Sequence, residues 1–153
     1  MKRLFLSLAE YVVCFMLYTW FTVPLHEWIH LEVLKWLGGD GYIIKTWYGG
    51  AVIFTKPPSN PTIVALAGGL GVAILYALIF YWDYYDGDWE EAGAVLPQLF
   101  SQLFYGVFEA SYIYTMPFHE YLKWAEILMT IGLVIGLATG LTLLFKKILS
   151  EET

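Results

Sequence analysis

Four long apolar segments, separated by short polar ones, dominate the pattern of the chain. They predict helices over residues 4–37, 62–82, 94–116 and 121–149. The first helix would be about 51 Å long at 1.5 Å per residue, whereas a bilayer core is about 30 Å thick. We therefore expect Pro24 to kink or restart it, unless the first turns, with Ser7 and Glu10, lie along the membrane interface.

A different pattern fills residues 40–56, after the first helix. Two short runs of β-branched and aromatic residues flank Gly49 and Gly50, which separate them. This pattern predicts a β-hairpin. The alternative is a re-entrant or irregular interfacial loop, anchored by the side chains of Trp47 and Tyr48.

Composition places the apolar segments in a membrane. Hydrophobic residues make up 59% of the 153 residues, charged residues only 14%, and the mean hydropathy is +0.60. Ordinary soluble domains are about a quarter charged, and a chain of this size cannot hide so much apolar surface from water. The predicted fold class is an all-α polytopic membrane protein with about four transmembrane helices, forming one membrane-embedded domain over residues 1–153.

The N-terminal segment is expected to remain as a membrane helix. Its apolar run exceeds the roughly 7–15 residues of a secretory signal core, and no small-x-small cleavage site precedes Pro24. Four spans would place both termini on one side of the membrane. Positive residues near the two ends predict that this side is cytoplasmic: Lys2, Arg3, Lys146 and Lys147.

The formal net charge is −6, and the acidic residues are clustered. An acidic loop is predicted after the second helix, from Asp83, Asp86, Asp88, Glu90 and Glu91. Because nothing in the sequence forms a basic surface, we expect no nucleic-acid partner. The single cysteine, Cys14, excludes an intrachain disulfide and any multi-cysteine metal site.

Three glycines repeat every four residues in the last helix, at Gly132, Gly136 and Gly140. They form a smooth strip on one helix face, which favours close packing of another helix. The strip could serve a neighbouring helix of the same chain or a second copy in a homo-oligomer.

Candidate chemistry lies in the first helix, in His26-Glu27-Trp28-Ile29-His30. Residues four apart lie on the same helix face, so His26 and His30 can direct two imidazoles at one metal ion. With Glu27 beside them to take a proton from water, this pattern suits Zn²⁺. Two of the chain's three histidines are in the motif. The alternative is a histidine pair hydrogen-bonded to neighbouring helices, or an interfacial helix whose polar residues meet water.

A catalytic zinc ion usually takes three protein ligands. One face of the third helix is polar, through Gln98, Gln102, Tyr105, Glu109 and Tyr112. The single carboxylate at membrane depth needs an interior partner, so Glu109 is the predicted third ligand. Gln102 and Tyr105 are then candidates for orienting the ligands or the substrate.

Other arrangements remain open from the sequence. Glu109 could stay protonated in a polar contact between helices, and His119 or Asp86 could supply the third ligand instead. The remaining glutamates of the apolar segments are expected to be interfacial or pore-facing rather than catalytic: Glu10, Glu32 and Glu126.

These residues resemble the site-2 protease-like intramembrane zinc metalloproteases over roughly residues 20–115. The His-Glu-x-x-His motif matches in full, Trp36-Leu37-Gly38-Gly39 is similar to the family's helix ending, and residues 67–72 look like a degenerate Gly-Pro motif. The resemblance implies an intramembrane peptidase whose substrate strand pairs with the hairpin at Gly50, Ala51 and Val52.

Two departures from the family pattern matter. Val72 occupies the place of the family's asparagine, which is thought to help the oxyanion, and no Asp-Gly pair lies in the third helix, where the family takes its third ligand. Zinc binding is less affected by these departures than peptide cleavage is.

Three functions therefore follow from the sequence. The first is hydrolysis of a membrane-spanning protein substrate within the lipid bilayer, by a zinc-activated water. The second is a membrane metallohydrolase acting on a lipid or another non-peptide substrate. The third is a non-catalytic metal-binding or structural membrane module.

Overall fold

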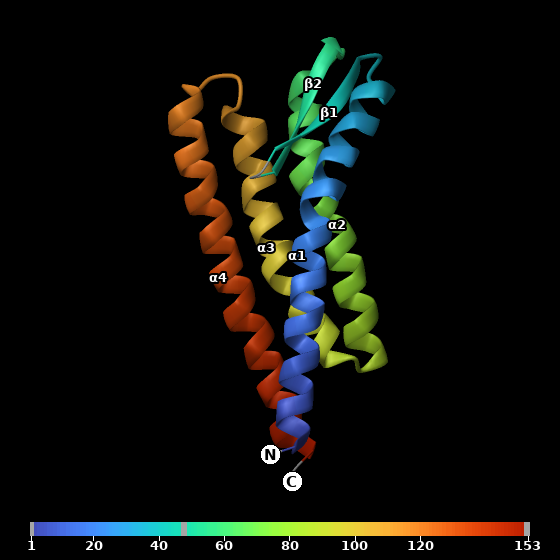
Figure 1. Ribbon diagram of the computed structural model, residues 1–153, viewed down its shortest axis with the longest axis vertical. Coiled ribbons are helices and arrows are strands. Elements are labelled where there is room, and N and C mark those ends of the chain that lie inside the picture. The colour runs from blue at the N-terminus through green and yellow to red at the C-terminus, as the bar shows by residue number, and fades with distance from the viewer. Residues whose placement is uncertain (1, 47–48, 152–153) are drawn as a thin grey trace.

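Four helices and one two-stranded antiparallel sheet account for the part of the chain that the computed structural model describes, residues 2–46 and 49–151. In chain order they are α1 (Lys2–Trp36), β1 (Asp40–Thr46), β2 (Gly49–Lys56), α2 (Pro61–Asp86), α3 (Trp89–Tyr112) and α4 (Phe118–Glu151). The helices form a bundle with the hairpin at one end and both chain ends at the other (Figure 1). The predicted fold class is confirmed.

Three of the helices are long and apolar enough to cross a membrane, among the residues described: α1 from Leu4, α2, and α4 to Ser150. Large apolar side chains on α1 lie on its outer surface; Trp20, for example, is 78% exposed. Such exposure suits contact with lipid. α3 is more polar, and it packs against all three other helices. Residues 92–98 are all buried, so α3 is enclosed by protein over this stretch.

Helix α1 continues through Pro24. Because proline has no N–H, the carbonyl of Trp20 loses its usual partner four residues on. The helix changes direction along its length (Figure 1), as expected for a kink of this origin. Of the alternatives for Pro24, the structure therefore has a kink in one helix rather than a restart.

The hairpin forms as predicted, but Gly49 and Gly50 lie within its second strand rather than between the two strands. Gly49 and Gly50 were expected to separate the strands; they lie in β2, where they pair with Thr46 and Lys45. The physical reason is close approach rather than turning, since a Cβ at Gly50 would lie 2.5 Å from Cγ of Glu27. The prediction for Trp47 and Tyr48 falls outside the described residues.

The predicted acidic loop is mostly helical. α2 runs on to Asp86 and ends at Gly87, whose φ of 88° is left-handed, and α3 begins at Trp89 with Glu90 and Glu91 in its first turn. Acidic side chains are favourable at a helix N-terminus, which extends α3 in this direction. At its other end α3 stops at Tyr112, four residues before the predicted 116, ahead of Pro117.

The three glycines of α4 pack against α3. A Cβ at Gly132 would lie 2.6 Å from the carbonyl oxygen of Phe100, and Gly136 and Gly140 lie equally close to the α3 backbone. The strip therefore serves a neighbouring helix of the same chain, the first of the two alternatives. Homo-oligomerisation stays a prediction, with no surface assigned to it by these glycines.

Candidate metal centre

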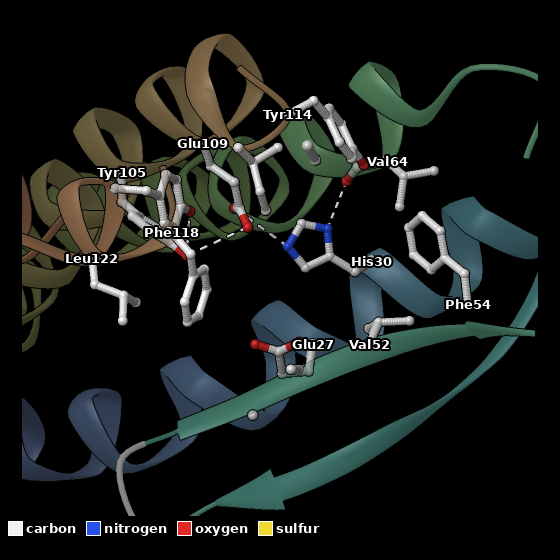
Figure 2. A pocket seen from close by; sticks show the side chains of 15 residues that line it. Glu27, His30, Val52, Phe54, Val64, Tyr105, Glu109, Tyr114, Phe118 and Leu122 are labelled. Carbon is white, nitrogen blue, oxygen red and sulfur yellow. Dashed lines mark hydrogen bonds and ion pairs between the residues drawn. The ribbon is translucent and has the colours of Figure 1, made fainter. Parts of the chain in front are cut away.

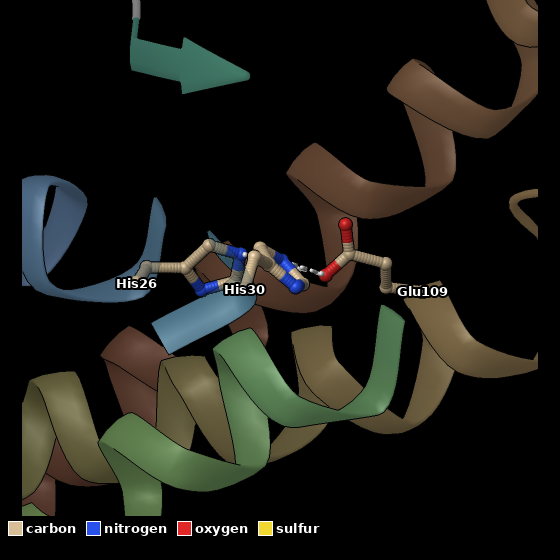
Figure 3. A group of neighbouring side chains, drawn as sticks. All are labelled: His26, His30 and Glu109. Atoms are coloured by element: carbon tan, nitrogen blue, oxygen red, sulfur yellow. Dashed lines mark hydrogen bonds and ion pairs between the residues drawn. The ribbon is translucent and has the colours of Figure 1, made fainter. Parts of the chain in front are cut away.

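Two imidazoles and one carboxylate converge inside the bundle (Figure 3). His26 and His30 come from successive turns of α1, and Glu109 comes from α3. The two Nε2 atoms are 2.8 Å apart, and Oε2 of Glu109 lies 3.4 Å from each of them. All three side chains are buried. The structure thus brings together the three residues that were predicted as a metal site.

The second nitrogen of each ring fixes how the ring is oriented. Nδ1 of His30 donates to the carbonyl oxygen of Val64 at 2.6 Å, and Nδ1 of His26 donates to Oε1 of Gln102 at 2.8 Å. These tautomers are assigned because a carbonyl or amide oxygen can only accept a hydrogen bond. Both Nε2 atoms are then left with a lone pair, and both lie 3.4 Å from Oε2 of Glu109.

This donor set fits a divalent metal. Oε2 of Glu109 is buried and has no hydrogen-bond donor among the described residues, a costly state unless a cation balances it. Ligand atoms around a tetrahedral Zn²⁺ lie about 3.4 Å apart, which matches the distances to Glu109. The 2.8 Å between the two nitrogens is shorter, so the rings would separate slightly on binding. Nitrogen and carboxylate ligands suit zinc and other first-row divalent ions.

A glycine makes room for one of these rings. Gly68 on α2 lies against the imidazole of His30, and any Cβ at this position would overlap the ring. Gly106 on α3 lies against Gly69 and Leu70 of α2 in the same way. Close approach of α2 and α3 therefore positions Glu109, one turn beyond Gly106. Sequence reasoning did not identify either contact, because each depends on which helices cross.

The other oxygen of Glu109, Oε1, accepts a hydrogen bond from the first of two linked tyrosines. The hydroxyl of Tyr105 donates to Oε1 of Glu109 at 3.4 Å, and the hydroxyl of Tyr121, on α4, donates to that of Tyr105 at 3.0 Å. The ring of Tyr105 also lies against that of His26, with centroids 5.3 Å apart. Oε2 alone therefore faces the histidines. Tyr121 was not predicted, since nothing in its local sequence indicates the contact.

A cavity of about 230 Å³ opens beside two of the three residues, His30 and Glu109 (Figure 2). Its polar side includes Glu27, His30 and Glu109, and its wall contains apolar side chains near the α3–α4 connection: Ile113, Phe118 and Leu122. Glu27 is buried, and its side chain lies between the cavity and β2. The structure therefore places the predicted general base in the same cavity as the candidate metal ligands.

Strand β2 forms one side of the cavity. Gly50, Ala51, Val52 and Phe54 line it, and β1 pairs with the edge of β2 that is farther from it (Figure 2). The side of β2 nearer the cavity has no strand beside it among the described residues. The three positions predicted as substrate-binding thus line the same cavity as Glu27.

A second, smaller cavity of about 140 Å³ reaches the same glutamate from another side. It is lined by His26, Glu27, Gln102 and Tyr105, together with Val23, Gly49, Gly50 and Met129. Glu27 consequently lines both cavities, as do Gly50 and Tyr105. The polar lining of the smaller one suits water.

The other residues considered from the sequence lie elsewhere. His119 is on the surface, with its side chain 83% exposed. Asp86, the last residue of α2, is exposed at the end of that helix farther from the candidate metal centre. Gln98 bonds to Thr19 and Thr22 of α1, one turn from the centre. Tyr112, Glu10 and Glu126 are exposed, and Glu32 pairs with Lys35. Neither His119 nor Asp86 is close enough to complete the site.

Comparisons of the chain with protein-family models, with curated proteins and with solved structures find no match.

Proposed function

We propose that this protein is an intramembrane zinc metallopeptidase. The observation that carries the proposal is the convergence of His26, His30 and Glu109 on one point, with Glu27 beside them in a cavity bordered by a strand edge. Two histidines and a glutamate, with a second glutamate nearby, form a donor set of the kind found in catalytic zinc sites. The resemblance to site-2 protease-like enzymes in the order of motifs supports the same conclusion.

Zn²⁺ held by His26, His30 and Glu109 would polarise the scissile carbonyl and activate a water molecule. Glu27 accepts one proton from this water as the water oxygen adds to the carbonyl carbon. It then delivers the proton to the amide nitrogen as the C–N bond breaks. Gln102 and the carbonyl of Val64 keep both rings in the orientation that the chemistry needs.

The substrate in this proposal is an extended segment of a membrane protein. Inside a bilayer, a peptide that leaves its helix must find new partners for its backbone N–H and C=O groups. The cavity-side edge of β2, from Gly50 to Val52, offers such groups by strand addition. The glycine at position 50 brings this edge close to Glu27.

The test is metal content measured by mass spectrometry on detergent-purified protein, followed by cleavage of a labelled transmembrane peptide in proteoliposomes. We expect one zinc per chain in the wild type and in Glu126→Ala, a matched exposed control, and none in His26→Ala or Glu109→Ala. Glu27→Gln should keep zinc and lose cleavage. Absence of zinc from a folded wild type after reloading would show instead a histidine pair that shares a proton, and would overturn the proposal.

A non-peptide substrate is the second candidate, favoured by the apolar wall of the cavity at Ile113, Phe118 and Leu122, which also suits an acyl chain. The same proteoliposomes, given a fluorogenic phospholipid in place of the peptide, separate the two. A purely structural metal is distinguished by unfolding: His26→Ala would then lose the fold together with the zinc.

A further inference from the structure

The cavity of about 230 Å³ beside Glu27 contains three neutral hydrogen-bond donors. Besides the two glutamates and the histidine, the polar side chains that line it are Tyr105, Tyr114 and Tyr121. The hydroxyl of Tyr114 donates to the carbonyl oxygen of Pro61 at 3.2 Å, and that of Tyr121 donates to Tyr105. Of the three, only the hydroxyl of Tyr105 directs its proton at the candidate metal centre.

The bond that Tyr105 now makes is a weak one. Its distance to Oε1 of Glu109 is 3.4 Å, whereas good O–H···O bonds are about 2.5–3.0 Å long. Transferring this hydrogen bond to a stronger acceptor nearby would therefore lose little. Tyr121 prepares the group for that role: its donated bond occupies a lone pair of the Tyr105 oxygen, which fixes the hydroxyl and polarises its O–H. The ring itself is held against His26.

We propose that Tyr105 is a catalytic residue that donates a hydrogen bond to the oxyanion formed when water adds to the substrate carbonyl. This inference rests on the proposed peptidase function. As the carbon–oxygen bond forms, the carbonyl electron pair moves to its oxygen, which accepts from Tyr105; as the C–N bond breaks, the pair returns. The phenol keeps its proton throughout. Tyr121 is a positioning residue, acting through Tyr105.

Residue 72 of the core does not supply such a donor. Val72 occupies the position where the resembling family has an asparagine for the oxyanion, and it is fully buried against Tyr76 and Val95, away from the cavity. It therefore supplies no donor. A preorganised donor at an oxyanion accounts for about 10²–10³ in kcat in other hydrolases. We therefore expect another residue to supply this donor.

Two peptide analogues test the inference without requiring turnover. The first is an acetylated dileucine phosphinic peptide, whose tetrahedral P–O⁻ imitates the oxyanion; the second is the matching reduced-amide peptide, which has no such oxygen. Binding of each to the zinc-loaded protein in detergent is measured by calorimetry. We expect Tyr105→Phe to weaken binding of the phosphinic peptide about 10²-fold. The affinities for the reduced-amide peptide and for zinc should stay within about twofold of the wild-type values.

Variants of two other tyrosines complete the design. Tyr121→Phe should weaken the phosphinic peptide roughly fivefold, the effect of one lost neutral hydrogen bond, again with unchanged zinc affinity. Tyr112→Phe, on the same helix but exposed, is the matched control and should change neither ligand. Where a peptide is cleaved, kcat should fall in the same order, with KM unchanged.

A merely structural Tyr105 gives another result. Removing an outer hydrogen bond that only orients Glu109 would lower zinc affinity, about 10- to 100-fold, and would weaken both peptides equally. That outcome, or no change in phosphinic-peptide binding, overturns the inference. Failure of the zinc-loaded wild type to bind either peptide overturns the proposed function and this inference with it, whereas failure of the inference alone shows only in the variants.

Discussion

Gly68 on α2 lies directly against the imidazole of His30, so that a side chain at position 68 would overlap the ring. This relationship decides where Nε2 of His30 can point. Gly68→Ala should displace the ring and reduce zinc affinity by at least about tenfold. Gly71→Ala is the control, because the atoms nearest to its Cβ would belong to the movable side chain of Ile29. Zinc titration with a competing chelator measures both. Unchanged affinity in Gly68→Ala would mean that His30 is not a ligand.

Gln102 and Gln98 lie one turn apart on α3 and give a matched pair of substitutions. Gln102 accepts from Nδ1 of His26, while Gln98 bonds, among the residues described, to Thr19 and Thr22 of α1. Gln102→Leu should therefore lower zinc affinity about 10- to 100-fold by releasing the ring. Gln98→Leu should leave zinc affinity unchanged and lower the stability of the bundle by about 0.5–1.5 kcal/mol, since its hydrogen bonds are lost while both threonines keep another partner. Equal zinc affinities in the two variants would contradict the tautomers assigned here.

Gly50 on β2 is predicted to matter for cleavage more than for zinc. Its missing side chain lets the strand pass close to Glu27, and a Cβ would lie 2.5 Å from Cγ of that residue. Gly50→Ala should push the strand or the glutamate aside, and reduce kcat/KM for the labelled peptide about tenfold, an effect expected from small misplacement of a catalytic group. Zinc content should stay at one per chain. Ile53→Ala, exposed on the same strand, should leave both kcat/KM and the zinc content unchanged.

The chemistry-bearing residues of the site could be predicted because helical spacing places them on one face of each helix. His26 and His30 are four apart on one helix face, and the 3–4 spacing of Gln102, Tyr105 and Glu109 makes one face of another. An isolated carboxylate at membrane depth then has few partners available to it. The structure places these side chains in mutual contact.

The residues that fit the site together could not be predicted in the same way. The contacts of Gly68 with His30 and of Tyr121 with Tyr105 join different helices, and their existence depends on the angles at which those helices cross. Gly50 was expected to turn the chain, because a glycine pair between β-rich runs is a turn signal. It serves close approach instead. The helix boundaries near Asp83 and Glu90 differ because charge at the helix N-terminus favours continuing the helix.

The glycine strip of α4 predicts a stability effect without an effect on assembly. A Cβ at Gly136 would overlap the backbone of α3 at Pro97, and backbone cannot move aside as a side chain does. Gly136→Ala should therefore lower the free energy of unfolding in detergent by about 1–3 kcal/mol. Val134→Leu, on the exposed face of the same helix, should change it by less than about 0.5 kcal/mol. An altered oligomeric state in Gly136→Ala, with unchanged stability, would assign the strip to a second copy instead.

Topology supplies the last prediction. α3 is more polar than its neighbours, but it is packed among three helices that are long and apolar enough to span the bilayer, so it should cross with them. We then expect both chain ends on one side of the membrane, and the positive residues near them predict that this side is cytoplasmic. In a Cys14→Ser background, Ser59→Cys and Thr115→Cys should react with an impermeant maleimide from outside right-side-out vesicles, and Ser150→Cys only after permeabilisation. Opposite labelling of Ser59→Cys and Thr115→Cys would mean that α2 and α3 do not both cross. Labelling of Ser150→Cys alone from outside would reverse the orientation and place the candidate metal centre toward the cytoplasmic side.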